Sequence, residues 1–298
     1  MKDIIVKGVI PALITPMIDN VIDYKAFKRI LQAQIDAKVS AVVLFGTTGE
    51  PLSLMPDEKT KIFYIARDLV GDRIPIICGI SSPITDFAVK SAECLSKLGA
   101  DGLLVVTPYY YTCTSQGLLE HYNKISEATD LPIIVYNVPA RTGVDLTVDY
   151  ELIKKIFKIK KIYAIKNAAK TKKSNLDFLS VSEIPVYCGN DSMNLESLIK
   201  GSYGSISVLS NLFPELETAM HNAFFSHSNT EKYFDEFLQK ICDAFSEIPN
   251  PIAIKYACSI RYGFKPHYRL PLTAPSDYQI EKIKKVTFEV LKEAEKLL

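Results

Sequence analysis

Short apolar segments alternate with amphipathic segments along the chain as far as residue 226. The apolar segments are rich in Val and Ile and are bounded by Gly, Pro, Asn or Ser, which is typical of buried parallel strands. They read GVIPALIT, AVVLFG, IPIICGI, GLLVVTP, LPIIVYN, IYAIKN, IPVYCGN and GSISVLS. The amphipathic segments have the apolar spacing of helices. They cover residues 24–37, 58–70, 85–98, 116–128, 148–157, 173–179, 193–200 and 214–226.

The two kinds of segment form eight strand–helix units in strict alternation. Such alternation implies parallel strands joined by right-handed crossovers. Eight units close into a (β/α)8 barrel, an α/β fold of about this length. We therefore predict a (β/α)8 TIM barrel over residues 1–226, which carries the catalytic site. An open doubly wound sheet is the alternative, but the eightfold count and the lack of a GxGxxG turn after the first strand favour the barrel.

Residues 227–298 do not fit the eightfold count. They predict three helices, over residues 231–246, 252–261 and 277–298, and the sequence EIPNP separates the first from the second. No residue type there suggests chemistry. We therefore predict a small C-terminal helical domain that serves packing or assembly.

The composition of the 298-residue chain is that of an ordinary globular protein, with 48% hydrophobic and 23% charged residues. A net charge of +1 favours neither nucleic acid nor an anionic membrane as a partner. No apolar run approaches the roughly 20 residues of a membrane span. The apolar start is interrupted by Lys7 and lacks a small-residue cleavage site, so we expect no secretory leader.

The cysteines and histidines bear on metal binding and on the cellular compartment. The six cysteines are scattered without a CxxC pair, and the four histidines are isolated from one another. Neither set has the spacing of metal ligands, so we predict no metal site. Reduced thiols agree with a cytoplasmic protein, which is the location that we expect.

The reactive side chains of a barrel lie where its strands end. Lys166 ends the sixth apolar segment and shares its parity with Ile162 and Ala164, so we expect all three to point into the barrel. A lysine among apolar side chains loses hydration and its pKa falls. A neutral amine can form a Schiff base with a carbonyl compound. The alternative is a strand-end lysine that extends to water.

The sequence YNVPARTG, residues 136–143, follows the fifth apolar segment and carries two further candidates. Tyr136 ends a strand that neighbours the strand of Lys166, about 4.8 Å away, and can shuttle protons for the amine. Alternatively, its hydroxyl bonds to the backbone at the barrel rim. Arg141 carries the planar guanidinium that best matches a carboxylate. Its alternative partner is a loop acid such as Asp145.

Two more strand-end sequences suit a small anionic ligand. GTTGE, residues 46–50, places Thr47 and Thr48 between two glycines, and such a turn can form a nest of N–H groups and hydroxyls for a carboxylate. An ordinary strand-to-helix turn is the alternative. TPYYYT, residues 107–112, places three tyrosines in one loop, although tyrosines are also common at subunit interfaces.

Taken together, these motifs resemble the dihydrodipicolinate synthase (4-hydroxy-tetrahydrodipicolinate synthase) family, which are lysine-dependent pyruvate aldolases built on a (β/α)8 barrel. The resemblance covers nearly the whole chain. Its motifs are, in order, GTTGE, TPYY, YNVPxRTG, the strand-end lysine, CGND, GSISV, NPIAIKYA and RLPL. Each motif alone is modest, but the ordered set at these spacings is specific.

The resemblance implies roles for the catalytic candidates. Lys166 forms the imine with pyruvate, and Tyr136 donates and accepts the protons. Thr47, Tyr136 and Tyr110 form a proton relay, in which Tyr110 comes from a neighbouring subunit. A homo-oligomer of at least two subunits follows, and the family pattern suggests a tetramer built from two tight dimers.

The resemblance also implies the substrate sites and the reaction. Thr48 holds the pyruvate carboxylate, and the backbone of Ile206 lines the pyruvate site with Gly189 nearby. Arg141 binds the carboxylate of the second substrate, L-aspartate 4-semialdehyde. The family, a class of lyases, condenses these two substrates in lysine and diaminopimelate biosynthesis. No metal or organic cofactor is implied, because the lysine provides the chemistry.

Two other functions remain open at this stage. N-acetylneuraminate lyases and 2-keto-3-deoxy sugar acid aldolases share Lys166, Tyr136 and the GTTGE turn, but they typically lack the arginine after YNVP. Arg141 therefore favours the synthase. A barrel that has lost catalysis and acts as a binding protein is the second alternative, although every relay residue is present.

The chain also departs from the family pattern. Where members typically read KEA(T/S)G, this chain reads KNAAK, so Asn167 replaces an acid and Lys170 replaces a small residue. This leaves open whether the second substrate differs.

A second departure concerns feedback inhibition. Lysine-sensitive members place His, Asn and Glu in an inhibitor cleft between subunits, where this chain has Pro56, Lys59, Pro83 and Phe87 and keeps Tyr109 alone. An ammonium group and an apolar ring do not suit the two amines of lysine. We therefore predict no feedback inhibition by L-lysine.

Overall fold

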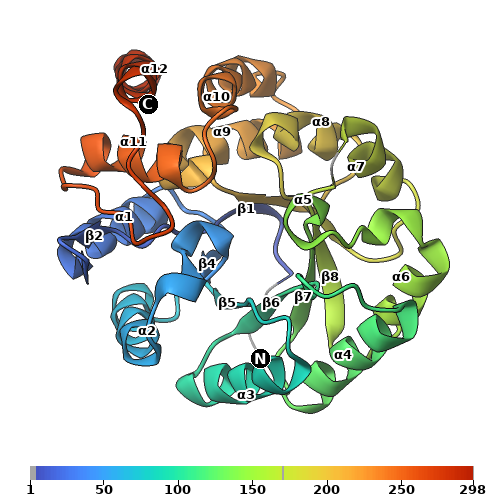
Figure 1. Ribbon diagram of the computed structural model, residues 1–298. Coiled ribbons are helices and arrows are strands. Elements are labelled where there is room, and N and C mark those ends of the chain that lie inside the picture. Colours follow the sequence, from blue (N-terminus) through green and yellow to red (C-terminus); the bar gives the residue numbers. More distant parts are fainter. Residues whose placement is uncertain (1–4, 170, 298) are drawn as a thin grey trace.

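The computed structural model describes residues 5–169 and 171–297, and in this part of the chain eight parallel strands lie inside a ring of helices (Figure 1). The strands are β1 (Gly8–Pro11), β4 (Val42–Leu44), β5 (Ile76–Ile80), β6 (Gly102–Val106), β7 (Ile133–Asn137), β8 (Ile162–Asn167), β9 (Val186–Cys188) and β10 (Gly204–Ser207). They pair in the order β1-β10-β9-β8-β7-β6-β5-β4, and a parallel bridge from Ala12 to Val43 joins the two ends. The predicted (β/α)8 barrel is confirmed.

The helices between the strands end within two residues of their expected limits. They are α1 (Tyr24–Asp36), α2 (Pro56–Val70), α3 (Thr85–Leu98), α4 (Ser115–Glu127), α6 (Tyr150–Phe157), α7 (Lys172–Leu179), α8 (Asn194–Ile199) and α9 (Pro214–Phe225). The sequence pattern did not predict the hairpin of β2 (Met17–Ile18) and β3 (Val21–Ile22) or the single turn α5 (Pro139–Thr142). Such elements are too short to show a periodicity.

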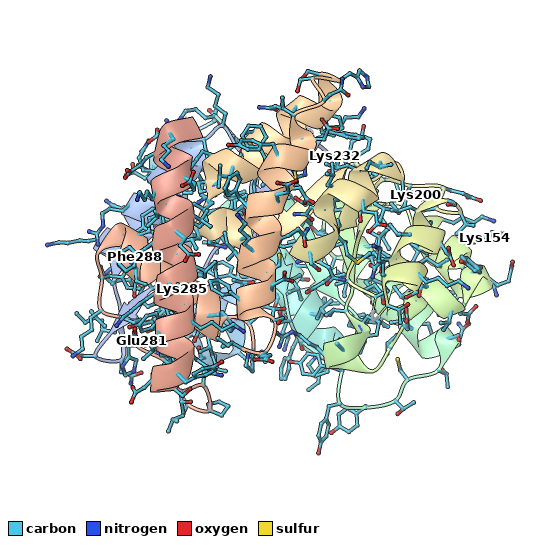
Figure 2. All side chains as sticks on the ribbon, turned by 90° about the horizontal axis from the view of Figure 1, so that it is seen from above. Lys154, Lys200, Lys232, Glu281, Lys285 and Phe288 are labelled. Carbon is cyan, nitrogen blue, oxygen red and sulfur yellow. The ribbon has the colours of Figure 1, made fainter. Side chains whose placement is uncertain are left out.

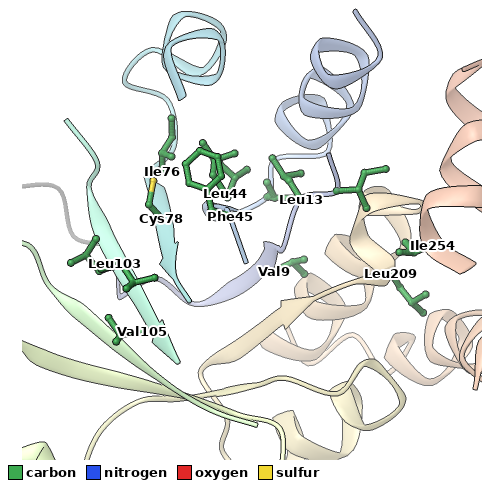
Figure 3. Close-up of a cluster of buried hydrophobic side chains, with 14 of the residues drawn as sticks. Val9, Leu13, Leu44, Phe45, Ile76, Cys78, Leu103, Val105, Leu209 and Ile254 are labelled. Carbon is green, nitrogen blue, oxygen red and sulfur yellow. The ribbon is translucent and has the colours of Figure 1, made fainter. Parts of the chain in front are cut away.

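Each strand contributes to two apolar layers, because successive side chains point to opposite faces. On β6, Leu103 and Val105 pack outward against the helices, whereas Leu104 and Val106 pack inside the barrel. Figure 3 shows part of the outer layer. Burial on both faces explains why the strands read as continuous apolar runs.

We expected Ile162, Ala164 and Lys166 to point to the same face of the sixth strand, and this expectation is wrong for Ile162. Ile162 pairs with Ile133 and packs in the outer layer, whereas Ala164 pairs with Ile134 and packs inside the barrel. The extra residue between them, Tyr163, is 48% exposed and forms a bulge that reverses the alternation. Because of the bulge, Ala164 lies on the same face of the strand as Lys166, whereas Ile162 lies on the opposite face.

Three more helices follow the barrel: α10 (Glu231–Phe245), α11 (Ile252–Tyr262) and α12 (Asp277–Leu297). In Figures 1 and 2, α10 and α12 lie side by side on the outside of the molecule, and α10 covers α9. None of the helices in the described residues is long and apolar enough to cross a membrane. This segment also contributes residues to the candidate site. We had expected it to serve only packing or assembly.

Candidate active site

The centre of the candidate site is a lysine that lies against a tyrosine ring inside the barrel. Tyr136 on β7 pairs directly with Lys166 on β8, and the Lys166 Nζ lies 4.4 Å from the centroid of the Tyr136 ring. Both side chains are buried, with 4% of Lys166 and 7% of Tyr136 exposed. The expectation that the two strand ends bring these groups together is therefore confirmed, and Lys166 does not extend to water.

Asn137 and Asn167, which directly follow Tyr136 and Lys166, are joined by a hydrogen bond between their side-chain amides. Asn137 Nδ2 donates to Asn167 Oδ1 at 2.8 Å, and Asn137 Oδ1 accepts from the Leu146 backbone N–H at 3.0 Å. Both asparagines are buried. Asn167, the residue that departs from the family pattern, thus has a neutral partner on the neighbouring strand. The other departure, Lys170, lies outside the described residues.

Gly189 follows β9 and lies directly beside the lysine. A Cβ atom at this position would lie 3.0 Å from Lys166 Cε and 2.9 Å from the Cβ of Ala168, so a larger residue would displace the lysine. Ile206 on β10 is fully buried and packs in the barrel interior with Tyr136. Of the two predicted pyruvate-site residues, Ile206 therefore lies in the barrel interior and Gly189 lies against the Lys166 side chain near its Cε atom.

The GTTGE sequence forms a 3₁₀ turn, η1 (Thr47–Gly49), at the end of β4. Thr48 is buried, and its Oγ1 accepts a hydrogen bond from Asn250 Nδ2 at 3.2 Å. Glu50 has φ 56° and forms a buried ion pair with Lys255 on α11, with 2.6 Å between Oε1 and Nζ. The turn is therefore tied to the C-terminal segment at two points.

A cavity of about 380 Å³ opens at the strand ends. Its lining includes Thr47, Val106, Val138 and Arg141, and Val106 is the strand partner of Tyr136. Lys166 and Tyr136 are not part of this lining, but the pairing of Val106 with Tyr136 places the two residues next to the cavity wall. The C-terminal segment supplies the rest of the wall through residues 250–251 and 269–272.

Arg141 is exposed at this mouth, and its Nη2 donates to the Asn250 carbonyl at 3.1 Å. Within the described residues, no carboxylate lies at ion-pair distance from Arg141. Asp145 instead accepts from Thr147 and from Asn137. The guanidinium therefore keeps donors for an anion, and the alternative salt bridge to Asp145 is not formed.

Tyr110 is separated from the other relay candidates. It is 89% exposed, has φ 75°, and its ring packs edge-on against Tyr111 at 5.2 Å. Its neighbour Tyr109 lines the cavity and donates its hydroxyl to the Ser81 carbonyl at 3.1 Å. Within one subunit, the structure does not bring Tyr110 together with Thr47 and Tyr136.

The described residues also contain no group of three or more His, Cys, Asp or Glu that is placed to hold a metal ion. Sequence reasoning missed Asn250 and the Glu50–Lys255 ion pair. Both lie within sequences already noted as motifs, GTTGE and NPIAIKYA, but nothing in the spacing connects positions about 200 residues apart.

Comparison with known proteins agrees with this geometry. The model of the dihydrodipicolinate synthetase family matches residues 5–289. A 4-hydroxy-tetrahydrodipicolinate synthase of Rickettsia bellii is 37% identical over 287 residues, which cover 95% of this chain and 96% of that protein. The dihydrodipicolinate synthase structure of Thermotoga maritima has 33% identity and a TM-score of 0.91, covering 96% of this chain and 98% of that chain. A dihydrodipicolinate synthase variant described as monomeric also has 33% identity and a TM-score of 0.91, with coverages of 96% and 97%.

Proposed function

The chain belongs to the dihydrodipicolinate synthetase family, and we propose that it is a 4-hydroxy-tetrahydrodipicolinate synthase, a lyase that condenses pyruvate with L-aspartate 4-semialdehyde. The observation that carries this function is the buried Lys166 amine against Tyr136, next to a cavity at whose mouth the Arg141 guanidinium forms no ion pair within the described residues. A Schiff-base lysine and a carboxylate clamp are the two groups that this condensation needs.

The reaction follows from the amine. Lys166 attacks the keto carbon of pyruvate, and loss of water leaves an imine. The imine acidifies the methyl group, which loses a proton and becomes an enamine. The enamine carbon attacks the aldehyde carbon of the semialdehyde. The amino group of that substrate then displaces Lys166 and closes a six-membered ring, and Tyr136 carries protons between these steps.

Two carboxylates require two binding sites, and we assign them to different residues. We assign the pyruvate carboxylate to Thr48, with the backbone of Ile206 and with Gly189 beside the amine. We assign the semialdehyde carboxylate to Arg141, which can bind it through two parallel hydrogen bonds.

We assign the proton relay to Thr47, Tyr136 and Tyr110, with Tyr110 supplied by a neighbouring subunit. The high exposure of the Tyr110–Tyr111 ring pair supports this assignment, because large aromatic side chains gather at subunit interfaces. A homotetramer of two tight dimers, working in the cytoplasm, is the assembly that we propose. Sedimentation that shows only monomers at assay concentrations would contradict it.

The test of the function is reductive trapping. The protein is incubated with pyruvate and borohydride, and its intact mass and peptide map are measured. We expect one pyruvate adduct, on Lys166, and turnover with L-aspartate 4-semialdehyde but not with N-acetylneuraminate or 2-keto-3-deoxy sugar acids. An adduct without turnover of the semialdehyde would favour the sugar acid lyases, and no adduct would favour a barrel without catalysis.

Replacing Arg141 with leucine is expected to raise the KM for L-aspartate 4-semialdehyde by roughly 10- to 100-fold, which corresponds to one lost charge-assisted bidentate contact. Pyruvate trapping should not change, because Arg141 lies at the cavity mouth and not beside Lys166. Arg141→Lys is the matched control, since it keeps the charge but loses the planar fork. An equal loss in pyruvate trapping would show that Arg141 has a different role.

L-lysine is expected not to inhibit the enzyme. Lys59 is partly exposed and Phe87 is 56% exposed, so this region presents an amine that adds like charge and an apolar ring where two ammonium groups would need acceptors. Initial rates are measured against L-lysine at fixed substrate concentrations. A saturable loss of roughly tenfold, about 1.4 kcal/mol of coupling, would contradict this prediction.

A further inference from the structure

The arginine that we assign to the semialdehyde carboxylate lies on the single helical turn α5, beside a buried threonine. Arg141 is followed by Thr142, the last residue of α5, and then by Gly143, which has φ 75°. Arg141 is exposed, whereas Thr142 is 9% exposed, and both residues line the cavity at the strand ends. One helical turn has little stability of its own, so its contacts with the barrel determine where it lies.

The hydroxyl group of Thr142 uses its full capacity for hydrogen bonds. A threonine hydroxyl has one hydrogen and two lone pairs. Thr142 Oγ1 accepts from Thr107 Oγ1 at 3.0 Å and from the Val144 N–H at 3.3 Å. Its own hydrogen can go to the carbonyl of Val138 or of Val144, each at 3.3 Å. One oxygen atom therefore joins both ends of the turn and ties the turn to the residue after β6.

Thr107 connects this turn to the strands of the reactive pair. It is fully buried and follows Val106, the last residue of β6. Its backbone N–H donates to the Tyr136 carbonyl at 3.2 Å, and Tyr136 pairs with Lys166 on the next strand. The position of α5 relative to the strand of the lysine is therefore set by backbone pairing and by one pair of hydroxyl groups.

The guanidinium group itself has few contacts. Arg141 Nη2 donates to the Asn250 carbonyl at 3.1 Å, and within the described residues this is the one hydrogen bond of the Arg141 side chain. A guanidinium carries five N–H donors, so most of them stay available to a ligand. The hydroxyl pair of Thr107 and Thr142 thus fixes the turn beneath a donor group that is open to the cavity.

We propose that Thr107 and Thr142 are positioning residues, which hold α5 so that Arg141 receives the carboxylate of the second substrate in register with Lys166. This inference rests on the proposed function, in which Arg141 binds that carboxylate. A displacement of about 1 Å can cost roughly 100-fold in rate, because the reacting carbon atoms no longer meet in the productive geometry. The hydroxyl pair therefore acts on the semialdehyde and not on pyruvate.

The first test is Thr107→Val, which replaces the hydroxyl with a methyl group of similar size and suits the end of a strand. Thr142 keeps its contacts within the turn, but the turn loses its tie to β6. We expect the KM for L-aspartate 4-semialdehyde to rise roughly tenfold, while single-turnover imine formation with pyruvate keeps the wild-type rate. An unchanged KM for the semialdehyde, or an equal loss in imine formation, would overturn the inference.

Thr142 tests the same pair from the other side if Thr107→Val does not fold. Thr142→Val leaves the Val144 N–H and the Thr107 hydroxyl without this partner, so the semialdehyde KM should rise at least as much as in Thr107→Val. Thr142→Ser keeps the hydroxyl and should retain a KM close to that of the wild type. A KM for Thr142→Ser as high as that for Thr142→Val would show that the hydroxyl does not position the turn.

The matched control is Thr129→Val, which removes another buried threonine hydroxyl. Thr129 is 8% exposed, and its Oγ1 accepts from the Leu131 N–H at 3.1 Å before β7, at the opposite end of that strand from Tyr136. This variant should lose stability without a change in the kinetics of either substrate. If it raises the semialdehyde KM as much as Thr107→Val does, general destabilisation explains the effect and the inference is overturned.

A double-mutant cycle with Arg141→Leu shows whether the hydroxyl pair acts through the arginine. In the Arg141→Leu background, Thr107→Val should cause no further rise in the semialdehyde KM, because the turn then has no guanidinium to position. Additive effects would overturn the inference and leave the proposed function intact. A wild-type protein that does not turn over the semialdehyde would instead overturn the proposed function, and the inference with it.

Discussion

Replacing Lys166 with methionine is expected to abolish the pyruvate adduct and to lower kcat/KM by roughly 10³-fold or more. Methionine has a similar length and no charge, so a site in which Lys166 is 4% exposed should accept it without a cavity. The imine cannot form without an amine, and no other amine is placed beside Tyr136 in the described residues. Borohydride trapping with pyruvate, read by intact mass, measures the loss directly.

The matched control is Lys160→Met, because Lys160 is exposed just before the strand that carries Lys166. It should keep both the adduct and the turnover. The other buried lysine in the described residues is Lys255, which is held by Glu50. A pyruvate adduct on Lys255, or one that survives in Lys166→Met, would contradict the assignment.

The barrel was predictable because each parallel strand is buried on both faces and each helix on one. Eight short apolar runs then leave few alternatives. The pairing of Lys166 with Tyr136 followed from the same logic, since both residues end neighbouring strands. The bulge at Tyr163 was not predictable, because a run of apolar residues does not show where the alternation slips.

The partners of the site residues were less accessible from the sequence. Asn137 and Asn167 follow Tyr136 and Lys166 directly, so their amide pair could have been inferred from strand adjacency. The contact between Arg141 and the Asn250 carbonyl could not, because it depends on how the C-terminal segment folds back over the barrel mouth. Periodicity predicts elements and their faces, but it carries no information on such long-range docking.

The C-terminal segment is therefore part of the site and not only a packing element. Asn250 contacts both Thr48 and Arg141, which we assign to the two substrate carboxylates. Arg269 lines the same cavity, but its guanidinium is occupied by Glu58 and by the Ser53 carbonyl. The segment thus contacts the arginine that we assign to substrate binding, and a second arginine, Arg269, ties the segment to Glu58 and Ser53.

Replacing Lys255 with methionine is expected to destabilise the protein by about 3–5 kcal/mol, the usual cost of leaving one member of a buried ion pair alone. Lys255 is fully buried, its Nζ lies 2.6 Å from Glu50 Oε1, and Glu50 Oε2 has no hydrogen-bond partner in the described residues. Denaturant unfolding at fixed protein concentration measures the loss, because an oligomer changes its apparent stability with concentration.

The double variant Glu50→Gln with Lys255→Met distinguishes two causes of the lost stability. One is the lost packing of the lysine side chain, and the other is the buried carboxylate left without a cation. If the cost comes from a buried uncompensated charge, the neutral glutamine should recover much of the lost stability, whereas additive losses would show that packing around Lys255 dominates. The ion pair also holds the turn that carries Thr48, four residues after β4. We therefore expect the double variant to regain stability but to have a higher KM for pyruvate than the wild type. The glutamine amide at position 50 has no lysine partner, so it no longer ties that turn to α11. A pyruvate KM equal to that of the wild type would show that the hydrogen bond between Thr48 and Asn250 holds the turn alone.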